Sequence, residues 1–293
     1  MDLSDLKKFE AVARLGSMNR AAATLNTVQS NMTARIRKLE DELGVPLFVR
    51  SAQGVDLTPA GERLLPYAKR LANLSQEAAR AVRDDGKPAG PLVLGSLETT
   101  AALRLSPLIA GFADRYPDVD LSLQTGTSCE LVERVLQNAI EGAFVCGPVD
   151  HPSLSEDVFY TEELVLLTPP NVTSLEAAFA GDETRIIVLR LGCSYRLILE
   201  GMLARRGIVN VRAMEFGTLE TIVACVSAGL GITLLPKAMI GPVWQDGRVA
   251  LHALPPAESR VNTVFIRRRD SHQSASLSAF LDHARLPDSK AAE

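Results

Sequence analysis

Apolar residues recur at three- and four-residue spacing from Leu3 to Val82, a pattern that is typical of helices with one buried face. The expected helices span Leu3–Leu15, Ala21–Leu25, Val28–Leu43 and Pro59–Val82. The Asn26-Thr27 step separates the second helix from the third, and Thr27 is expected to cap the third. Two helices therefore meet across a tight turn, and the first helix packs beneath them.

A β-hairpin is expected directly after the third helix. The Gly44-Val45-Pro46 step ends that helix, and the apolar runs Leu47–Arg50 and Val55–Leu57 flank a short polar turn. Thr58 and Pro59 then form a typical helix start, a capping residue followed by proline at the first helical position. The front of the chain is thus predicted to be a helix-turn-helix with a wing.

Beyond residue 91 the pattern changes to short apolar runs that alternate with helical stretches. Strands are expected at Leu92–Ser96, Asp120–Gln124, Gly142–Cys146, Leu164–Leu167, Ile186–Leu191, Val211–Phe216, Ile232–Leu235 and Val261–Ile266. Helices are expected at Ala101–Tyr116, Glu130–Asn138, Leu175–Ala180, Tyr195–Arg206, Leu219–Ala228 and Ser274–Ala284. Alternation of this kind predicts parallel sheets with helices on both faces. Its repetition indicates two α/β subdomains with a cleft between them.

The third expected helix carries residues that are typical of a helix that reads DNA. Short polar side chains crowd its first turns and cations follow, with no acidic residue between Thr27 and Leu39. Such a helix suits base edges and flanking phosphates, although a solvated surface helix would show the same polarity. The candidate base contacts are Gln29, Ser30, Asn31 and Thr33. The candidate phosphate contacts are Arg35, Arg37, Lys38 and Arg50, and in the wing Arg50 and Gln53 are placed to meet the DNA backbone or the minor groove. The DNA-binding set is completed by Ser17, Asn19, Arg20 and Thr27.

The fourth expected helix has an apolar stripe that needs a partner. Its members lie at three- and four-residue spacing, which is the pattern of a coiled-coil seam. Because the helix is long and lies between two globular parts, the simplest cover for the stripe is a second copy of the same helix. The candidate dimerisation residues are Leu64, Tyr67, Leu71, Leu74 and Ala78.

Many of these residues together resemble the N-terminal signature of LysR-type transcriptional regulators. The matching residues are Ser17, Arg20-Ala21-Ala22, Leu25, Gln29-Ser30, Ile36, Leu39-Glu40, Leu43-Gly44, Leu47-Phe48, Arg50 and Leu57-Thr58-Pro59-Ala60-Gly61. The departures from the signature bear on which DNA sequence is preferred and not on the family; they are Asn19, Asn26, Asn31 and Thr33. The resemblance implies double-stranded promoter DNA as a partner, a small-molecule effector, and a homodimer or homotetramer. RNA polymerase is a further candidate partner.

The resemblance covers nearly the whole chain and implies its domain organisation. The expected parts are a winged helix-turn-helix at 1–58, a linker and dimerisation helix at 59–84, a hinge at 85–91 and an effector-binding domain at 92–293. The last part is expected to hold two Rossmann-like α/β subdomains, similar to a type 2 periplasmic binding protein. Subdomain I is expected at about 92–163 and 268–293, and subdomain II at about 164–267.

Hydroxyl residues gather at four expected strand-to-helix turns of the effector-binding domain. Ligands of parallel α/β sheets bind at such turns, beside free helix N–H groups, although ordinary helix capping also places hydroxyls there. Arg196 near a helix N-terminus favours a small anion, with Glu98 either repelling it or holding Arg196 in place. Two of the turns are similar to those of the LysR branch that includes regulators of glutamate synthesis. The candidate effector-binding residues are Ser96, Glu98, Thr99, Thr100, Thr127, Ser128, Cys129, Cys193, Ser194, Arg196, Phe216, Gly217 and Thr218.

The formal net charge of −4 is unevenly divided along the chain. Met1–Pro91 holds 14 Lys and Arg against 11 Asp and Glu, whereas the remainder holds 17 against 24. Because the cationic excess at the front is small, tight DNA binding requires a dimer and is expected to fall steeply with salt. No signal peptide and no apolar run of membrane-spanning length is visible, which predicts a cytoplasmic protein.

Three other classes of function fit the sequence less well. An enzyme is disfavoured because Ser194 lacks a GxSxG context and the chain has no HExxH or P-loop motif. A solute-binding protein is disfavoured by the missing export signal and by the front domain. A thiol-based redox sensor is the sharper rival, since Cys129 and Cys193 both lie near expected helix N-termini, which lower a thiol pKa. The cysteines and histidines show no metal-ligand spacing, so no metal or other cofactor is expected.

Overall fold

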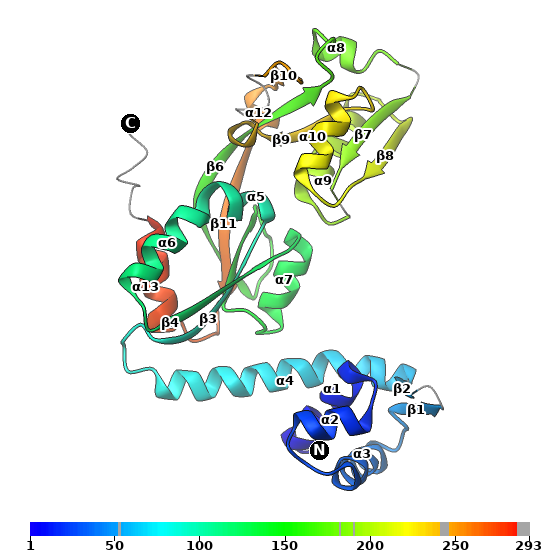
Figure 1. Cartoon of the computed structure of the whole chain (residues 1–293), viewed down its shortest axis with the longest axis vertical. Helices are drawn as coiled ribbons and strands as arrows, with labels where there is room; N and C mark the ends of the chain where they lie inside the picture. Colours follow the sequence, from blue (N-terminus) through cyan, green and yellow to red (C-terminus); the bar gives the residue numbers. More distant parts are fainter. Residues whose placement is uncertain (52–53, 182, 190, 241–245, 286–293) are drawn as a thin grey trace. The chain divides into compact units, whose positions relative to one another are not determined.

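The computed structural model describes residues 1–51, 54–181, 183–189, 191–240 and 246–285. The chain forms two compact units, one of Met1–Gly86 with Gln137–Ala139 and one of Lys87–Leu136 with Ile140–Glu293. Each unit is built around apolar clusters of its own, and each is described by itself (Figure 1).

The N-terminal unit combines a helical head, a hairpin and a long helix. Its elements are α1 (Leu3–Leu15), α2 (Met18–Thr24), α3 (Gln29–Leu43), β1 (Phe48–Ser51), β2 (Gly54–Leu57) and α4 (Pro59–Arg83). One apolar cluster holds them together, with Phe9, Met32 and Ile36 fully buried and Ala68 joining α4 to the head. Burying large apolar side chains of this kind contributes about 1.5–3 kcal/mol each. The predicted helix-turn-helix and its hairpin wing are confirmed.

The turn between α2 and α3 differs in detail from the expectation. Asn26 takes a left-handed conformation with φ of 50°, and Val28 is the residue that precedes the first turn of α3. Thr27 Oγ1 instead accepts a hydrogen bond from Asn31 Nδ2 at 2.8 Å. The prediction that Thr27 caps this helix was therefore wrong by one residue. Because Val28 precedes the helix, its side chain does not lie on the buried face on which it was expected. Leu25 and Leu43, which were expected on buried helix faces, are also exposed.

Hydrogen bonds and one close backbone approach fix the start of α4 against the hairpin. Thr58 Oγ1 accepts the backbone N–H of Gly61 at 3.1 Å and donates to the carbonyl oxygen of Pro46 at 2.7 Å. Glu40 at the end of α3 accepts the backbone N–H of Leu47 at 2.7 Å. No side chain fits at Gly61, because a Cβ would lie 2.2 Å from the carbonyl oxygen of Leu47. The Thr-Pro-Ala-Gly motif thus holds the wing on the long helix.

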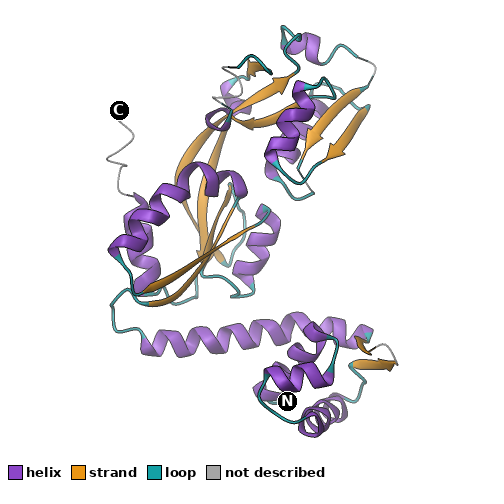
Figure 2. Ribbon diagram, in the orientation of Figure 1, coloured by secondary structure: helices purple, strands orange, loops and turns teal. Residues whose placement is uncertain are grey.

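The second unit consists of two lobes that share two long strands, β6 (Leu154–Thr168) and β11 (Arg260–Arg268). The first lobe holds β3 (Gly90–Ser96), α5 (Glu98–Thr100), the π-helix η1 (Ala101–Leu105), α6 (Ser106–Arg115), β4 (Val119–Thr125), α7 (Ser128–Leu136), β5 (Gly142–Cys146) and α13 (Ala275–Arg285). The second lobe holds α8 (Leu175–Ala178), β7 (Thr184–Val188), α9 (Ser194–Arg205), β8 (Val211–Glu215), α10 (Leu219–Ser227), β9 (Thr233–Pro236), the 3₁₀-helix η2 (Lys237–Met239), β10 (Ala250–Ala253) and α12 (Pro256–Ser259). Figure 2 shows β6 and β11 running side by side from one lobe into the other.

The large sheet of the second unit is mixed, whereas β7 and β8 form a separate parallel sheet. The large sheet has the order β10-β6-β11-β5-β3-β4, and β9 also pairs with β6. Strand β3 is parallel to β4 and β5, and β7 is parallel to β8. In contrast, β11 is antiparallel to both β5 and β6, so the expectation of parallel sheets was only partly right. The antiparallel pair consists of the two strands that carry the chain between the lobes.

Alternate residues of the central strands of the first lobe enter two different cores. Leu94 and Phe144 belong to the cluster that packs under α6 and α13, whereas Ala143 and Val145 belong to the cluster under α7. Helices therefore cover both faces of this sheet, as predicted (Figure 2). A third cluster fills the second lobe beneath α9 and α10.

The return strand β11 leaves the second lobe earlier than the expected boundary at residue 267. Its residues 263–266 pair with β5 of the first lobe, and Phe265 is buried in the core of that lobe. Val261 packs against the core of the second lobe. The crossing therefore lies near residue 262, a point that the sequence does not reveal because a buried apolar strand looks the same in either lobe.

Candidate functional site

Helix α3 presents a polar face to solvent because its apolar face is anchored in the core. Met32, Ile36 and Leu39 are fully buried. The residues predicted to contact bases lie around the first turns of the helix, with Thr33 half-buried and the others exposed. The exposed polar residues in the first turns and the middle of α3 are Gln29, Ser30, Asn31, Arg37 and Lys38, and Asp41 and Glu42 are exposed in its last turn.

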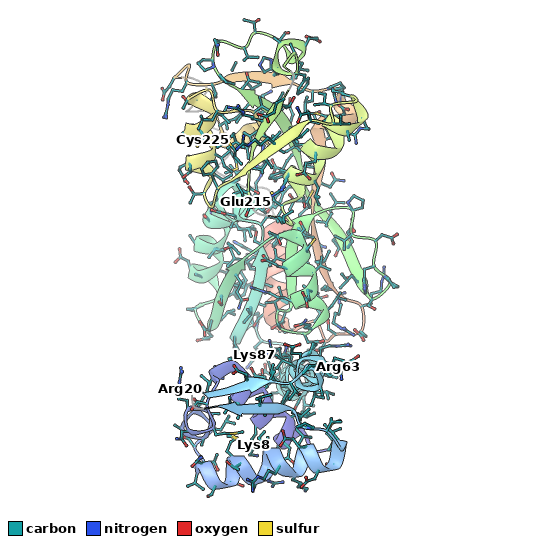
Figure 3. All side chains as sticks on the ribbon, turned by 90° about the vertical axis from the view of Figure 1, so that its right-hand side faces the viewer. Lys8, Arg20, Arg63, Lys87, Glu215 and Cys225 are labelled. Atoms are coloured by element: carbon teal, nitrogen blue, oxygen red, sulfur yellow. The ribbon has the colours of Figure 1, made fainter. Side chains whose placement is uncertain are left out.

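Several other residues of the predicted DNA-binding set have structural roles or lie elsewhere. Ser17 caps α2, where its Oγ accepts the backbone N–H of Arg20 at 3.4 Å. The Arg20 side chain is exposed on α2 (Figure 3), as is its neighbour Asn19. Arg50 lies on β1, and Gln53 lies outside the described residues. The short turn after Thr24 joins α2 to α3, and the two helices pack against each other.

Arg35 is tied to the interior of the N-terminal unit. Its Nη1 lies 3.4 Å from Oδ1 of Asp5, a carboxylate oxygen that is buried and accepts no hydrogen bond from the described residues. Leaving a buried charge without its ionic partner costs about 3–5 kcal/mol. Arg35 therefore has a stabilising role in the fold that the sequence did not suggest, and Arg37 is the better probe of a phosphate contact.

The stripe predicted to pair α4 with a second copy is exposed over most of its length. Tyr67, Leu71 and Leu74 are 62%, 40% and 51% exposed, and Ala78 is exposed as well. Leu64 is the exception, because it is half-buried against the core of the head. The part of the stripe available to a partner therefore begins at Tyr67.

A cavity of about 310 Å³ lies in the second unit between turns of its two lobes. The ends of β3 and β4 lead into it from the first lobe, and β7 and β8 lead into it from the second. These are the strand ends at which α/β sheets bind ligands, and the mixture of hydroxyl and apolar side chains suits a small polar organic molecule. The cavity is lined by Leu97, Glu98, Thr99, Thr125, Gly126 and Thr127 of the first lobe and by Leu189, Cys193, Ser194, Tyr195, Phe216 and Gly217 of the second.

The structure places the predicted effector-binding residues in two groups. Those that line the cavity are Glu98, Thr99, Thr127, Cys193, Ser194, Phe216 and Gly217. Those that do not line it are Ser96, Thr100, Ser128, Cys129, Arg196 and Thr218. Ser96 and Thr100 are buried, and Thr218 is exposed and caps α10. The hydroxyls outside the cavity thus include both a capping residue and two that turn into the protein.

Two hydrogen bonds cross from one lobe to the other beside the cavity. Ser128 Oγ at the start of α7 lies 2.8 Å from Ser194 Oγ at the start of α9. Thr99 Oγ1 lies 3.2 Å from the hydroxyl of Tyr195. Burial raises the pKa of Tyr195, so its hydroxyl stays protonated and can donate. The lobes are therefore joined through side chains of the same turns that line the cavity.

Arg196, predicted to attract a small anion, is already engaged by carboxylates. Its Nε donates to Glu200 Oε1 at 2.9 Å and its Nη1 donates to Glu215 Oε2 at 3.0 Å. The hydrogen bond from Arg196 to Glu200 raises the pKa of Arg196, and Glu215 stands at the end of β8 (Figure 3). Glu98 was expected either to repel the anion or to hold Arg196 in place, and the carboxylates that hold Arg196 are instead Glu200 and Glu215. Among the described lining residues, Glu98 is the charged side chain.

Cys193 does not have the environment expected of a redox-sensing thiol. Burial raises the pKa of Cys193, although it stands at the start of α9 and accepts backbone N–H groups there. Burial also raises the pKa of Cys146. Cys129 is exposed on α7, and Cys225 lies on α10 (Figure 3). The expected lowering of the pKa at a helix N-terminus was therefore wrong for Cys193, because burial has the larger effect.

Some lining residues were missed by sequence reasoning. Thr125 ends β4 and could have been found, because it satisfies the same strand-end rule as its neighbours. Leu97, Leu189 and Tyr195 look like core residues in the sequence, and only their position at a strand-to-helix turn exposes them to the cavity. Gly192 has a φ of 92°, and a Cβ there would lie 3.0 Å from Thr127 Oγ1 in the opposite lobe. This glycine permits the close approach of the two lobes.

Among the residues that the structure describes, no group of three or more His, Cys, Asp or Glu side chains could hold a metal ion. Over the same residues, no helix combines the length and apolarity that crossing a bilayer requires, and the long α4 is amphipathic.

A winged helix-turn-helix with an exposed polar helix face, followed in the chain by a two-lobed α/β unit with a cavity between its lobes, defines the class of ligand-responsive transcriptional regulators. Residues 3–62 match the family model for the bacterial regulatory helix-turn-helix protein, lysR family, and residues 85–286 match the model for the LysR substrate binding domain. The chain belongs to the LysR family of transcriptional regulators, which are not enzymes.

Individual relatives agree with this assignment over nearly the full chain. The HTH-type transcriptional regulator GltR of Bacillus subtilis (strain 168) is 41% identical over 285 residues, which cover 97% of this chain and 96% of the relative. CzcR of Bacillus anthracis is 40% identical over 281 residues and 96% of each chain. Among solved structures, full-length CbnR in complex with its target DNA has a TM-score of 0.67 at 25% identity and covers 97% of this chain and 99% of its own. A full-length OxyR variant from Pseudomonas aeruginosa has a TM-score of 0.70 at 22% identity and covers 98% of this chain and 96% of its own.

Proposed function

We propose that this regulator binds promoter DNA as a dimer or tetramer and that a small molecule in the cavity between the lobes changes this binding. The observation that carries the proposal is the pair of cross-lobe hydrogen bonds beside the cavity, Ser128 to Ser194 and Thr99 to Tyr195. A ligand that competes with these bonds, or adds to them, favours one angle between the lobes over another by its difference in affinity. RNA polymerase is a proposed further partner, and the cytoplasm is the proposed place of action.

The proposed base contacts are Gln29, Ser30, Asn31 and Thr33, and the proposed phosphate contacts are Arg37, Lys38 and Arg50, with Ser17, Asn19 and Arg20 beside them. Full-length CbnR, a structure similar to this chain over nearly its whole length, was solved in complex with its target DNA, which supports DNA binding by this fold. Base contacts and phosphate contacts differ in their effect on specificity, which provides a test.

Gln29→Ala is expected to weaken binding to the preferred DNA by about 1–3 kcal/mol and to leave binding to a scrambled duplex nearly unchanged. Arg37→Ala is expected to weaken binding to both duplexes alike. It is also expected to reduce the slope of log affinity against log salt concentration by about one, because one phosphate contact is lost. The preferred sequence is first selected from random duplexes, and affinities are then measured by fluorescence anisotropy at several salt concentrations. Equal weakening on both duplexes by Gln29→Ala would remove that residue from the base-reading set.

The charge of the effector can be tested through Glu98. We propose that a small anion, the effector predicted from the sequence, is held by helix N-termini and hydroxyls, because Arg196 is bonded to Glu200 and Glu215. Glu98 then opposes it as a like charge on the cavity wall. Unit charges about 4 Å apart interact by about 1 kcal/mol in water, so Glu98→Gln is expected to tighten binding of an anion roughly fivefold and to weaken binding of a cation by a similar factor.

The measurement is a thermal-shift screen of the full chain with matched small carboxylates and small amines, followed by titration of each hit on the Glu98→Gln variant. Thr161→Ser, on β6 outside the cavity lining, is a control that is expected to change no effector affinity. Hits that are all amines, and that weaken on Glu98→Gln, would contradict the anionic effector while leaving the cavity as the binding site. Charged hits whose affinity is unchanged by Glu98→Gln would place the ligand elsewhere.

A further inference from the structure

Val28 lies directly before the start of α3, the helix that is proposed to read DNA. Its apolar side chain is not buried in the core of the unit. It is 65% exposed, whereas Met32, four residues further along the same stripe, is fully buried. The backbone of Val28 is extended, with φ of −91° and ψ of 150°, so its side chain leaves the buried face just before the helix begins. The residues that follow it, Gln29, Ser30 and Asn31, are exposed and polar.

Capping does not explain Val28 either. The other helices of the unit each begin with a side chain that accepts a backbone N–H, namely Asp2 for α1, Ser17 for α2 and Thr58 for α4. Helix α3 begins without a side-chain cap. Valine is among the least favourable residues at this position, and Ser, Thr, Asn or Asp would stabilise the helix. The valine therefore lowers the stability of the helix without filling the core.

We propose that Val28 contacts the C5-methyl group of a thymine in the major groove and thereby selects a T·A pair. The thymine methyl is the apolar group that base pairs display in this groove, and residues at the start of a recognition helix lie closest to base edges. An exposed isopropyl group beside Gln29 is suited to that methyl group and to no phosphate. This contact would add an apolar determinant of sequence specificity to the polar contacts proposed above. The proposal rests on the proposed role of α3 as the DNA-reading helix.

The test removes the methyl group from the DNA and the isopropyl group from the protein in turn. Each thymine of the selected sequence is replaced singly by deoxyuridine, which keeps the hydrogen-bonding groups and lacks the methyl group. Full-length wild-type protein is expected to lose roughly fourfold in affinity at one thymine of each half-site, because burying a methyl-sized group is worth about 0.8 kcal/mol. Val28→Ser is expected to bind the thymine and deoxyuridine duplexes alike at that position and to keep the wild-type response at all other positions.

Val45→Ser is the matched control, because Val45 is also an exposed valine, 43% exposed, just beyond the other end of α3. It is expected to keep the wild-type sensitivity to the missing methyl. Hydrogen exchange across α3 gives a second readout: Val28→Ser supplies a cap, so exchange in the first turn is expected to slow about twofold or more while DNA affinity falls. The proposal is overturned if wild-type protein is insensitive to deoxyuridine at every thymine, or if Val28→Ser shows the wild-type penalty. Faster exchange in Val28→Ser would likewise overturn it, because the residue would then stabilise the helix.

Discussion

Leu71→Asp is expected to convert the protein from a dimer into a monomer. Leu71 lies at the middle of the exposed stripe on α4, four residues from Tyr67 and three from Leu74. In a two-fold symmetric seam each substitution is present in both copies, so two carboxylates would be buried without a partner. An uncompensated buried charge costs about 3–5 kcal/mol, so two cost about 6–10 kcal/mol, and the dimer dissociation constant should therefore rise by about 10⁴-fold or more. DNA affinity should fall with it by roughly 10²-fold or more, because one half-site no longer assists the other.

Sedimentation velocity and DNA titration on the same preparation measure both effects. Gln76→Asp introduces the same charge on the same helix at an exposed polar position, and it is expected to leave the protein dimeric. Far-UV circular dichroism checks that α4 remains helical in both variants. A Leu71→Asp protein that is still dimeric, with unchanged DNA affinity, would place the seam on another face.

Periodicity predicted the helices of the N-terminal unit because each has one buried face and polar residues on the others. It erred at Val28, where the apolar pattern continues although the helix has not yet begun. The first half of β6 was missed for the opposite reason, since residues 155–163 are rich in acidic side chains and owe their extended form to pairing with β11. The short β10 likewise depends on β6 for its pairing. Strand pairing between distant segments is a tertiary effect that a local pattern does not contain.

The position of the cavity could be predicted, but its chemistry could not. Strand-to-helix turns are recognisable in the sequence, and ligands of α/β sheets bind at such turns. This rule alone identifies Thr99, Thr127 and Ser194 as candidate effector-binding residues. The partners of Arg196 illustrate the limit: Glu200 lies one helical turn away and follows from spacing, whereas Glu215 arrives from a neighbouring strand. Burial of Cys193 is likewise a property of the packed lobes and reverses the pKa shift that its place in the sequence suggested.

Joining Ser128 and Ser194 covalently is expected to change DNA binding without any effector. Their Oγ atoms are 2.8 Å apart across the lobes, so cysteines at both positions are expected to reach disulfide distance with a small adjustment, at a sulfur–sulfur bond of about 2.05 Å. The disulfide would hold the two lobes at the angle at which Ser128 and Ser194 are now hydrogen-bonded. If that angle controls the protein, the locked form should differ from the free form by a coupling of about 1–3 kcal/mol, or roughly 5–150-fold in DNA affinity.

The variant is best made in a background in which Cys129, Cys146 and Cys193 are replaced by alanine, because these native thiols lie on the same turns or beside them. The reduced form of the same protein is the control, since it differs from the locked form by one bond only. Ser128→Cys alone, under oxidising conditions, controls for effects of the thiol itself.

The most direct measurement is the affinity of this double-cysteine protein for its selected DNA, determined by fluorescence anisotropy before and after oxidation and again after reduction. The account predicts a change of at least about fivefold on oxidation that is fully reversed by reductant, together with loss of the response to any effector found in the thermal-shift screen. Equal affinity in the oxidised and reduced forms, with the disulfide verified by intact mass, would contradict control of DNA binding by the angle between the lobes.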